Sequence, residues 1–562
     1  MFNTFKKIIL LCDKNKIFLY FLILLNSLSV LVEMVSIGLL IPIGTILFFP
    51  DLIIKNELFN LFFKFFATEN TDDHFYILII ILISAYIFKF LYFLFLSLIE
   101  NYITNNIQYN LSITLFDNFL KSSYKDFKKY KLSEINNTIF NESEVFHASL
   151  SNLIILISEI FLIFTVVAFL LFMNPFLVLS ILSIFLIGSL LFIFFILNKI
   201  KMLGSIRLMN AKSSIDNILN TFAAFIDIKI INSSSFFIKK YSNTFHKFIN
   251  SNRWHGTFLR LPRIWIEFLL VCTFVFIFFY IKFYISDVES FFTIFSFMVV
   301  FSIRLLPSFN RILSSYQTIK YNSVSIDSLF SKINYEKNSY FNNTTTTNFD
   351  TVVLNNVSFS YENNKTLIFD KFNYTFKKNK IIGIKGRSGK GKTTLLLLLL
   401  GLIKPTSGNI LLNNSKNINN FCDWINKFGY VSQEAVLIDD TIKNNILFGQ
   451  SKKYFNQKKY LSSIDFSLLS KIIEDKGEDA IIDNNNKLSS GQGQRVHLAR
   501  AIYHSKDILI LDEATNNLDK ENETLFLEKL SFIKKNKIIV FVTHSDYVLS
   551  FCDEIINLDN IK

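Results

Sequence analysis

Cysteine is scarce in this chain, and its copies follow no spacing that a disulfide framework or a metal site needs. The four among 562 residues are Cys12, Cys272, Cys422 and Cys552, which excludes a disulfide-held scaffold and a cysteine-ligated zinc site. Charge is scarce too, since 18% of the residues are charged and 51% are hydrophobic. This composition excludes an ordinary soluble protein and predicts that much of the chain lies in lipid.

A cleavable targeting signal is also missing. Lys6 and Lys7 precede an apolar stretch, but a cleaved signal has an apolar core of only ~7–15 residues. Here the apolar sequence that starts at Phe18 continues far beyond that length, so we expect the segment to be retained. Residues 1–16 are predicted to form an amphipathic helix at the cytoplasmic surface of a membrane.

Six apolar runs are long enough to cross a bilayer, which takes about 20 helical residues each. They are Phe18 to Phe49, Phe75 to Ile99, Leu150 to Met173, Phe176 to Leu197, Ile264 to Ile285 and Phe291 to Leu306. Asn26, Glu33 and Pro42 interrupt the first run, which we expect to be one long, bent helix.

The distribution of lysine and arginine sets the expected orientation, because cytoplasmic loops keep an excess of both. Basic residues crowd two segments, 121–131 and 199–260, which we therefore place in the cytoplasm. The opposite connections are short or acidic, so both termini are predicted to lie inside. The formal charge of +13 then indicates a membrane-proximal basic surface, and no nucleic-acid partner is expected.

A polar tract, Asn338 to Asn348, separates the apolar part of the chain from a part in which strands alternate with helices. The tract cannot bury a core and suits a linker, while the alternation predicts a mostly parallel sheet. We therefore expect a transmembrane α-helical domain at residues 17–335, a linker at 336–350, and an α/β domain at 351–562.

The α/β part carries one phosphate loop, and the chain has no internal repeat. The loop reads Gly386-Arg387-Ser388-Gly389-Lys390-Gly391-Lys392-Thr393, and Thr394 continues into an apolar helix. Backbone N–H groups of such a loop surround phosphates, and its glycines let the backbone approach closely. Lys392 is expected to reach the outer phosphates and Thr393 to bind Mg²⁺. The sequence therefore predicts a nucleotide-binding domain that takes ATP and Mg²⁺.

A pair of carboxylates, Asp512 and Glu513, ends the apolar strand that begins at Ile508. Asp512 is expected to hold Mg²⁺ through water, and Glu513 to act as the base that orients the attacking water. Read alone, such a pair is more often ordinary surface. This pair, however, lies about twenty residues after the segment Leu488 to Gln492, and that position favours the catalytic interpretation.

That segment is Leu488-Ser489-Ser490-Gly491-Gln492. Together with the phosphate loop it resembles the nucleotide-binding domain of ABC proteins. The resemblance implies that Ser489, Gly491 and Gln492 close over ATP held by a partner domain, so that the protein works as a pair.

The ABC resemblance assigns four further residues. It implies that Tyr361 stacks on adenine and that Gln433 touches Mg²⁺ or water and senses the membrane domain. It also implies that His544 contacts the terminal phosphate and that Asp519 belongs to the D-loop. A half-buried strand tyrosine is the alternative for Tyr361.

Three departures from the ABC pattern stand out. Ser490 replaces the usual glycine, Asn516-Asn517 replaces the common Ser-Ala, and Asp483 to Asn486 replaces an acidic-Gly segment. A side chain at position 490 is expected to slow turnover. Because Glu513 is intact, whereas degenerate half-sites of heterodimers commonly lose this residue, we expect a homodimer with two working sites.

Six spans followed by one nucleotide-binding domain, here called the motor, resemble the half-transporters of the ABC exporter class, with the type IV exporter fold. In that class the helices run beyond the bilayer and touch the motors, so the resemblance implies long cytoplasmic helix extensions. The resemblance places these contacts near Ser123 to Glu134 and near Phe222 to Asn232.

Charges within the spans bear on the substrate, because a charge in a bilayer is costly. Lys89 lies near the middle of the second run, and Arg304 and Arg311 are seven residues apart, which places them on one face of a continuous helix. Arg263 has Glu267 four residues on as a predicted helical ion pair. For Arg263 and Arg311 the alternative is a side chain that merely snorkels to the cytoplasmic surface.

The surroundings of these charges resemble a narrower group, the lipid-linked oligosaccharide flippases of bacterial protein N-glycosylation. The matching segments are Val32-Glu33, Leu261-Pro262-Arg263-Ile264, Arg304-Leu305-Leu306-Pro307-Ser308 and Asn310-Arg311-Ile312. In those proteins a basic lining handles the pyrophosphate of a polyprenyl-linked glycan, and arginine offers paired donors to phosphate oxygens. Leu52 to Phe66 matches their external helix, for which an ordinary amphipathic loop helix is the alternative.

The resemblance implies a flippase in the bacterial inner membrane that contacts membrane lipid and a lipid-linked glycan. An exporter of another lipid, a hydrophobic drug or a peptide is the alternative. A soluble ABC ATPase of DNA repair or translation shares the motor and not the spans.

Overall fold

The computed structural model describes residues 2–39, 71–171, 175–284, 304–333, 349–361, 366–418, 424–483 and 487–560. The predicted external stretch Leu52 to Phe66, nearly all of the sixth apolar run and most of the predicted linker lie outside these residues. The chain divides into two compact units. The first comprises Met1–Ser122 and Lys129–Lys337, and the second comprises Ser123–Lys128 and Asn338–Lys562.

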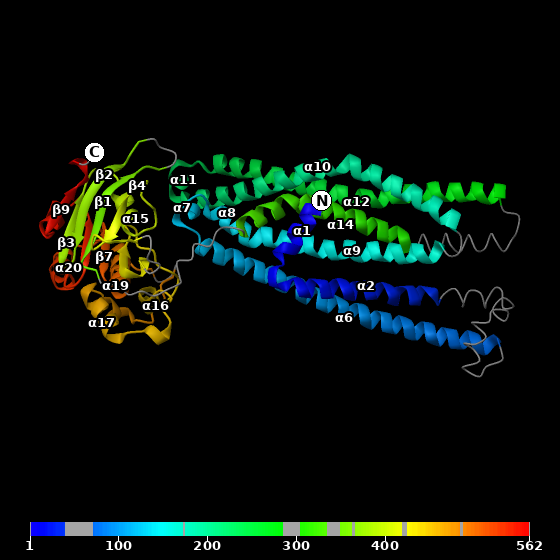
Figure 1. Ribbon diagram of the computed structural model, residues 1–562, viewed down its shortest axis with the longest axis horizontal. Coiled ribbons are helices and arrows are strands. Elements are labelled where there is room, and N and C mark those ends of the chain that lie inside the picture. The colour runs from blue at the N-terminus through cyan, green and yellow to red at the C-terminus, as the bar shows by residue number, and fades with distance from the viewer. Residues whose placement is uncertain are drawn as a thin grey trace. The chain divides into compact units, whose positions relative to one another are not determined.

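The first unit consists of helices throughout its described residues (Figure 1). They are α1 (Phe2–Leu11), α2 (Lys16–Gly38), α6 (Thr71–Leu120), α8 (Leu132–Asn137), α9 (Ser143–Leu171), α10 (Pro175–Ala223), α11 (Phe225–Ile231), α12 (Ser234–Tyr284) and α14 (Leu306–Ile333). A 3-10 turn at Asp13–Asn15 separates α1 from α2, so the amphipathic N-terminal helix ends earlier than the predicted residue 16. A π-helical turn at Thr138–Glu142 joins α8 to α9.

Three helices are much longer than a bilayer requires. α6, α10 and α12 contain 50, 49 and 51 residues, or about 75 Å each at 1.5 Å per residue, against a hydrocarbon core of about 30 Å. Among the described residues, four helices are long and apolar enough to span, or five if the bent α10 counts as one span. Five of the six predicted runs fall on these helices, and α2 covers the first run only to Gly38.

The helices of the first unit pack in pairs around two apolar cores. α10 lies against α12, α9 against α14, and α2 against α6 (Figure 1). One core joins α1, α2, α6, α9 and α14, and the other joins α2, α9, α10, α12 and α14. Gly204 lets α10 approach α14 closely, because a Cβ there would collide with the backbone carbonyl oxygen of Tyr321. Close packing of this kind fixes the relative positions of the helices within the unit.

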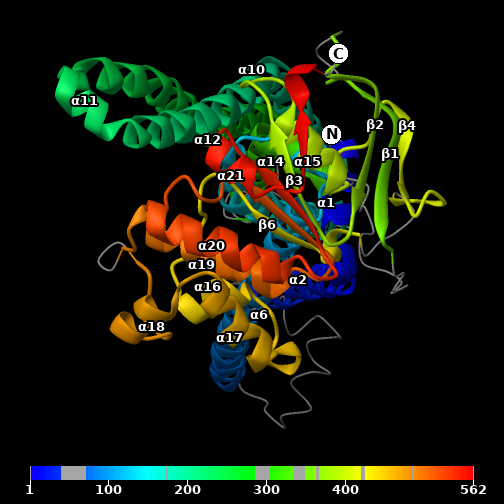
Figure 2. The ribbon, with the colours of Figure 1, turned by 90° about the vertical axis from the view of Figure 1, so that its left-hand side faces the viewer.

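The second unit is an α/β domain with two sheets (Figure 2). Its strands are β1 (Thr351–Phe359), β2 (Phe369–Lys377), β3 (Lys380–Lys385), β4 (Ser407–Leu412), β5 (Lys416–Asn417), β6 (Phe428–Val431), β7 (Ile508–Asp512), β8 (Ile538–Val542) and β9 (Glu554–Asn557). Its helices are α7 (Tyr124–Phe127), α15 (Lys392–Leu399), α16 (Ile442–Leu447), α17 (Gln457–Phe466), α18 (Ser470–Lys476), α19 (Ser490–His504), α20 (Lys520–Ile533) and α21 (Asp546–Ser550).

The antiparallel sheet has the order β2-β1-β4-β5, and the parallel sheet has the order β6-β7-β8-β3-β9. Side chains alternate between the two faces of the parallel sheet, as the pleat dictates. Ile508 and Ile510 of β7 join a core with α15 and the antiparallel sheet, whereas Leu509 and Leu511 join a core with α19 and α20. Both faces are therefore covered, and the strands are apolar throughout as in other buried parallel sheets.

Candidate nucleotide-binding site

Four predicted site segments follow the carboxyl ends of neighbouring parallel strands. β3 and β8 end level with each other, and so do β6 and β7. The phosphate loop follows β3, Gln433 follows β6, Glu513 follows β7 and His544 follows β8. Ligands of open α/β sheets bind at this edge. The topology thus gathers residues that lie up to 158 positions apart in the sequence, from Gly386 to His544.

The phosphate loop has the backbone shape that its glycines permit. Gly389 and Gly391 adopt left-handed φ values of 83° and 91°, which other residues avoid. A Cβ at Gly391 would lie 2.6 Å from Cγ2 of Ile368, so glycine is needed there for space as well. The side chains at positions 387–390 are exposed, and the backbone N–H of Arg387 donates to Asp559 at 3.1 Å.

Lys392 and Thr394 connect the loop to other parts of the site. Lys392 Nζ donates to the carbonyl oxygen of Gly386 at 2.6 Å and lies 2.8 Å from Nε2 of His544. The hydroxyls of Tyr361 and Thr394 are 3.2 Å apart. Tyr361 is 44% exposed beside the phosphate loop, and its ring packs edge-on against that of Phe359 with 5.1 Å between the ring centroids.

Glu513 lies at the centre of a hydrogen-bond cluster. Its Oε2 accepts from the amide of Gln433 at 3.0 Å and from the amide of Asn516 at 2.8 Å. Its Oε1 is 3.7 Å from Nε2 of His544, too far for a hydrogen bond. The backbone of Glu513 has a left-handed φ of 50°, and its N–H donates to Val542 of β8 at 2.9 Å. Uncommon backbone of this kind is typical of functional positions.

Asp512, the carboxylate next to Glu513, is partly buried. Burial, followed by the neighbouring charge of Glu513, raises the pKa of Asp512 to about 6. A hydrogen bond from the phenol of Tyr430 and the charge of Lys392 act in the opposite direction. A carboxylate short of compensating charge at this edge is suited to a cation.

The oxygen groups at this edge fit Mg²⁺ bound together with ATP. Thr393 supplies an exposed hydroxyl, Gln433 an amide and Asp512 a carboxylate. Magnesium usually takes one or two protein oxygens, with phosphates and water completing its shell. In keeping with this, no group of three or more His, Cys, Asp or Glu side chains that could hold a metal occurs within the described ranges.

The segment Leu488 to Gln492, here called the signature segment, forms the capped start of a helix. The hydroxyl of Ser489 accepts the backbone N–H of Gln492 at 3.2 Å, and the side-chain oxygen of Gln492 accepts the N–H of Ser489 at 3.0 Å. This reciprocal capping box stabilises α19 by about 1 kcal/mol. Gly491 packs on the D-loop, since a Cβ there would lie 2.6 Å from the carbonyl oxygen of Asn517. Ser490 is exposed, so the fold accommodates a side chain at position 490.

Asp519 starts helix α20. Its carboxylate accepts the backbone N–H of Asn522 at 2.8 Å, and this bond, the first cause, lowers the pKa of Asp519. Gln494 of α19 donates to the carbonyl oxygen of Ala514 at 3.2 Å. Together with the Gly491 contact, this bond ties the start of α19 to the segment between Glu513 and Asp519.

The sequence did not single out two residues that support the site. Arg500 of α19 is buried and donates to carbonyl oxygens of Asn445 and Val436 at 2.7 and 2.8 Å, which binds α19 to the segment after Gln433. Burial lowers the pKa of Arg500 to about 10. Asn516 was identified only as a departure from the ABC pattern, although its position three residues after Glu513 was a signal for a contact within one turn.

The candidate substrate cations lie in the first unit, and carboxylates pair with all four. Glu33 of α2 contacts Lys89 of α6 at 3.5 Å and also forms an ion pair with Arg304. The other pairs are Arg311 with Glu159 at 3.0 Å and the predicted pair Arg263 with Glu267 at 3.1 Å, which is confirmed. Arg263 is 74% exposed and Arg304 is 14% exposed. Four cations and three carboxylates leave a net charge of +1.

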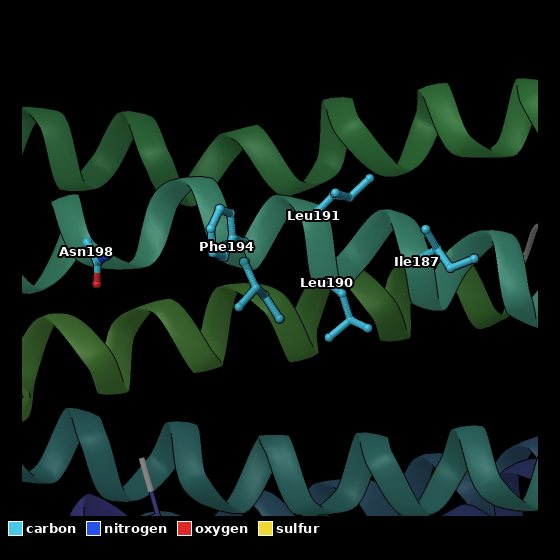
Figure 3. Close-up of a pocket in the computed structure, with 6 residues that line it drawn as sticks. Ile187, Leu190, Leu191, Phe194 and Asn198 are labelled. Carbon is cyan, nitrogen blue, oxygen red and sulfur yellow. The ribbon is translucent and has the colours of Figure 1, made fainter.

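An apolar depression lies on α10, away from these cations in the sequence. Its volume is about 560 Å³, and its lining residues are Ile187, Leu190, Leu191, Ile193, Phe194 and Asn198 (Figure 3). Asn198 is the one polar lining residue. The depression therefore offers contact to apolar chains and no cation to a phosphate.

The second unit has the features of a P-loop nucleotide-binding domain of the ABC type: a phosphate loop that opens a helix, a strand end with two carboxylates and a serine-capped signature helix. Residues 369–516 match the family model described as ABC transporter.

Proteins of known sequence and structure support this class. The chain is 33% identical over 210 residues to a "Probable ABC transporter ATP-binding/permease protein" of Haemophilus influenzae, and 34% identical over 215 residues to an ATP-dependent lipid A-core flippase of Idiomarina loihiensis. These matches cover 36% and 37% of this chain, and 37% and 36% of the relatives. The chain thus spans less than two fifths of the length of these two relatives.

The likeness in fold extends over nearly the whole chain. A bacterial Atm1-family ABC exporter with ATP bound superposes with a TM-score of 0.79, covering 97% of this chain and 93% of that one at 17% identity. The predicted fold, a helical membrane-type part followed by an α/β nucleotide-binding domain, is therefore confirmed as that of an ABC exporter.

Proposed function

We propose that this chain is one half of an ATP-driven transporter that moves a lipid-linked substrate across a membrane. The observation that carries the proposal is the gathering of the phosphate loop, Gln433, Glu513 and His544 at one sheet edge in a chain with the fold of an exporter. ATP hydrolysis supplies the energy, and the helices of the first unit form the path.

We propose the following roles for the residues of the site. Backbone N–H groups of positions 386–393 surround the phosphates, and Lys392 neutralises the outer ones. Glu513 accepts a proton from the attacking water through its Oε1, while His544 faces the terminal phosphate. Mg²⁺, held through Thr393, Gln433 and Asp512, would neutralise charge that develops on the phosphates.

The active form is proposed to be a homodimer. Within the described residues, the hydrogen bonds of Ser489 and Gln492 remain inside their own turn, which leaves the start of α19 able to close over ATP on a second copy. Glu513 is present, so both sites of such a dimer are complete. Short helices, α7 and α11, lie in the two segments predicted to contact the motors.

The proposed substrate is a polyprenyl diphosphate that carries an oligosaccharide, moved from the inner to the outer leaflet of the bacterial inner membrane. Lys89 and Arg304 favour a diphosphate, because both lie in or beside spans and share one carboxylate. A lipid A-core flippase among the relatives supports a lipid substrate.

The pairing of every candidate cation with a carboxylate, together with the apolar depression on α10, favours a second candidate function. This is export of another lipid, a hydrophobic drug or a peptide. The two candidates differ in whether Arg304 and Arg311 are needed for transport.

Reconstitution in liposomes tests the proposal. The wild-type protein is expected to hydrolyse ATP and translocate polyprenyl-diphosphate glycan, and Glu513→Gln to bind ATP without turnover. If Arg304→Ala and Arg311→Ala leave glycolipid translocation intact at normal ATPase rates, the diphosphate substrate is wrong. Stimulation of ATPase activity by a hydrophobic compound in the same variants would then favour the second candidate. Recovery of the protein in the soluble fraction would contradict the membrane location.

A further inference from the structure

We infer that Asn516 is a positioning residue that holds the carboxylate of Glu513 in the orientation needed to accept a proton from water. The inference rests on the proposed ATP hydrolysis. It gives a role to the D-loop position at which this chain departs most visibly from the ABC pattern.

Two contacts connect Asn516 to Glu513. The side-chain amide of Asn516 donates to Oε2 of Glu513 at 2.8 Å, and the backbone N–H of Asn516 donates to the carbonyl oxygen of Glu513 at 3.3 Å. The second bond closes the turn in which Glu513 has its left-handed φ of 50°. Asn516 therefore fixes both the backbone and the carboxylate of the proposed base.

The two donors on the carboxylate select which oxygen can act. The amides of Gln433 and Asn516 both donate to Oε2, and within the described residues no group lies within hydrogen-bond distance of Oε1, since Nε2 of His544 is 3.7 Å away. Oε1 is thus the oxygen left for water. A carboxylate held by two N–H donors is oriented before water arrives, which is how general bases are made efficient.

Serine, the common residue at this position, would not reproduce the contact. Its hydroxyl lies one bond closer to the backbone than the amide nitrogen of asparagine, and the bond observed spans a turn of three residues. Gln433 follows a different strand, β6, whereas Asn516 lies in the same turn as Glu513. Asn516 therefore holds the base from within its own turn.

Steady-state ATP hydrolysis by the purified full-length protein tests the inference. Asn516→Leu keeps the size of the side chain and removes the donor. It should lower kcat about tenfold, which is part of the ~10²–10⁴-fold acceleration that a general base contributes. The KM for ATP should stay within about twofold of the wild-type value. Asn516→Gln keeps an amide and should retain most of kcat. Asn516→Asp has the shape of asparagine but puts a like charge beside Glu513, and should lower kcat further than leucine does.

Asn409→Leu is the control, because the side-chain oxygen of Asn409 of β4 accepts an exposed hydrogen bond of 2.8 Å from the amide of Asn417, on the antiparallel sheet and outside the site. It should leave kcat unchanged. In a Glu513→Gln background, which binds ATP without turnover, Asn516→Leu should leave the affinity for ATP unchanged, since it acts through Glu513. Thermal unfolding midpoints of all variants separate loss of fold from loss of orientation.

The outcomes distinguish this inference from the proposed function. If the wild type hydrolyses ATP, Glu513→Gln is inactive, and both Asn516→Leu and Asn516→Asp match the wild type in kcat, the role of Asn516 is refuted and ATP hydrolysis stands. A rise in KM with unchanged kcat also refutes it, because Asn516 would then bind nucleotide. If the wild type itself does not hydrolyse ATP, the proposed function fails with it.

Discussion

Replacing Glu33 with glutamine should destabilise the first unit and strengthen its attraction for an anionic lipid. Glu33 of α2 is 13% exposed and is shared by Lys89 of α6, 22% exposed, and Arg304, 14% exposed, just before α14. Glutamine keeps the shape and hydrogen-bonding capacity of the side chain but removes its charge. Two cations are then left in the membrane part without a counter-charge from residue 33.

The magnitude follows from the distances. At 3.5 Å, two unit charges attract by about 5 kcal/mol at an effective dielectric constant of about 20, before desolvation is subtracted. Removing one partner of a buried ion pair usually costs about 3–5 kcal/mol, because the other charge stays buried. We therefore expect Glu33→Gln to lower the free energy of unfolding by about 3 kcal/mol, since the cluster is partly exposed.

Thermal or denaturant unfolding in one detergent measures this loss. The control is Glu267→Gln, which breaks the helical pair with Arg263, whose two side chains are 55% and 74% exposed. An exposed pair of this kind contributes below about 1 kcal/mol. Adding Lys89→Met to Glu33→Gln should restore part of the lost stability, because one unpaired cation is removed.

The effect of Glu33→Gln on the substrate is measured in liposomes, as the stimulation of ATPase activity by a polyprenyl diphosphate lipid. With Glu33 neutralised, Lys89 and Arg304 are both available to the diphosphate, so the half-maximal lipid concentration should fall severalfold. If Glu33→Gln is as stable as Glu267→Gln, the ion cluster is energetically unimportant. If the half-maximal concentration is unchanged or rises, a diphosphate does not compete with Glu33, and the cationic substrate site is wrong.

Three further predictions concern the second unit. Ser490→Gly should raise the steady-state ATPase rate and cost about 0.5–1 kcal/mol of stability, because glycine disfavours a helix. Its counterpart Gly491→Ala should lower the ATPase rate, because the added Cβ would lie 2.6 Å from the carbonyl oxygen of Asn517. Burial lowers the pKa of His497 to about 4, so the folded state favours the neutral imidazole. The free energy of unfolding should be full above pH 6.5 and fall by up to about 3 kcal/mol toward pH 4. Urea unfolding of His497→Gln should show a shallower pH dependence. Arg500→Met should cost about 2–4 kcal/mol in urea unfolding, since the carbonyl oxygens it serves stay buried and unpaired.

Local sequence determines the phosphate loop, which explains why its prediction needed no tertiary information. Gly389 and Gly391 occupy left-handed backbone, and the apolar strand β3, Lys380–Lys385, leads directly into the loop. Hydropathy marks only the part of a helix that lies in lipid. The second apolar run was therefore predicted to end at Ile99, whereas α6 continues to Leu120 through polar residues that carry no such signal.

Long-range pairing is what the sequence could not provide. Glu33 and Arg304 are 271 positions apart, and each was identified separately, yet nothing in either segment indicates that they meet. Arg263 and Glu267, four residues apart, were predicted correctly because helical geometry alone brings them together. The contact of Asn516 with Glu513 was within reach of the same kind of argument, but a comparison with a family pattern marked the residue only as unusual.

The length of α6 makes the ion pair between Lys89 and Glu33 sensitive to a tilt of the helix. α6 is one continuous rod of 50 residues, and Lys89 lies 31 residues from its end at Leu120, or about 46 Å along the axis. If the rod tilts by about 5° around that end, Lys89 moves sideways by about 4 Å. A displacement of that size away from Glu33 would take Lys89 from 3.5 Å to well beyond ion-pair distance. α6 thus has the length of a lever, in which a small tilt at Leu120 would separate the charges of Lys89 and Glu33.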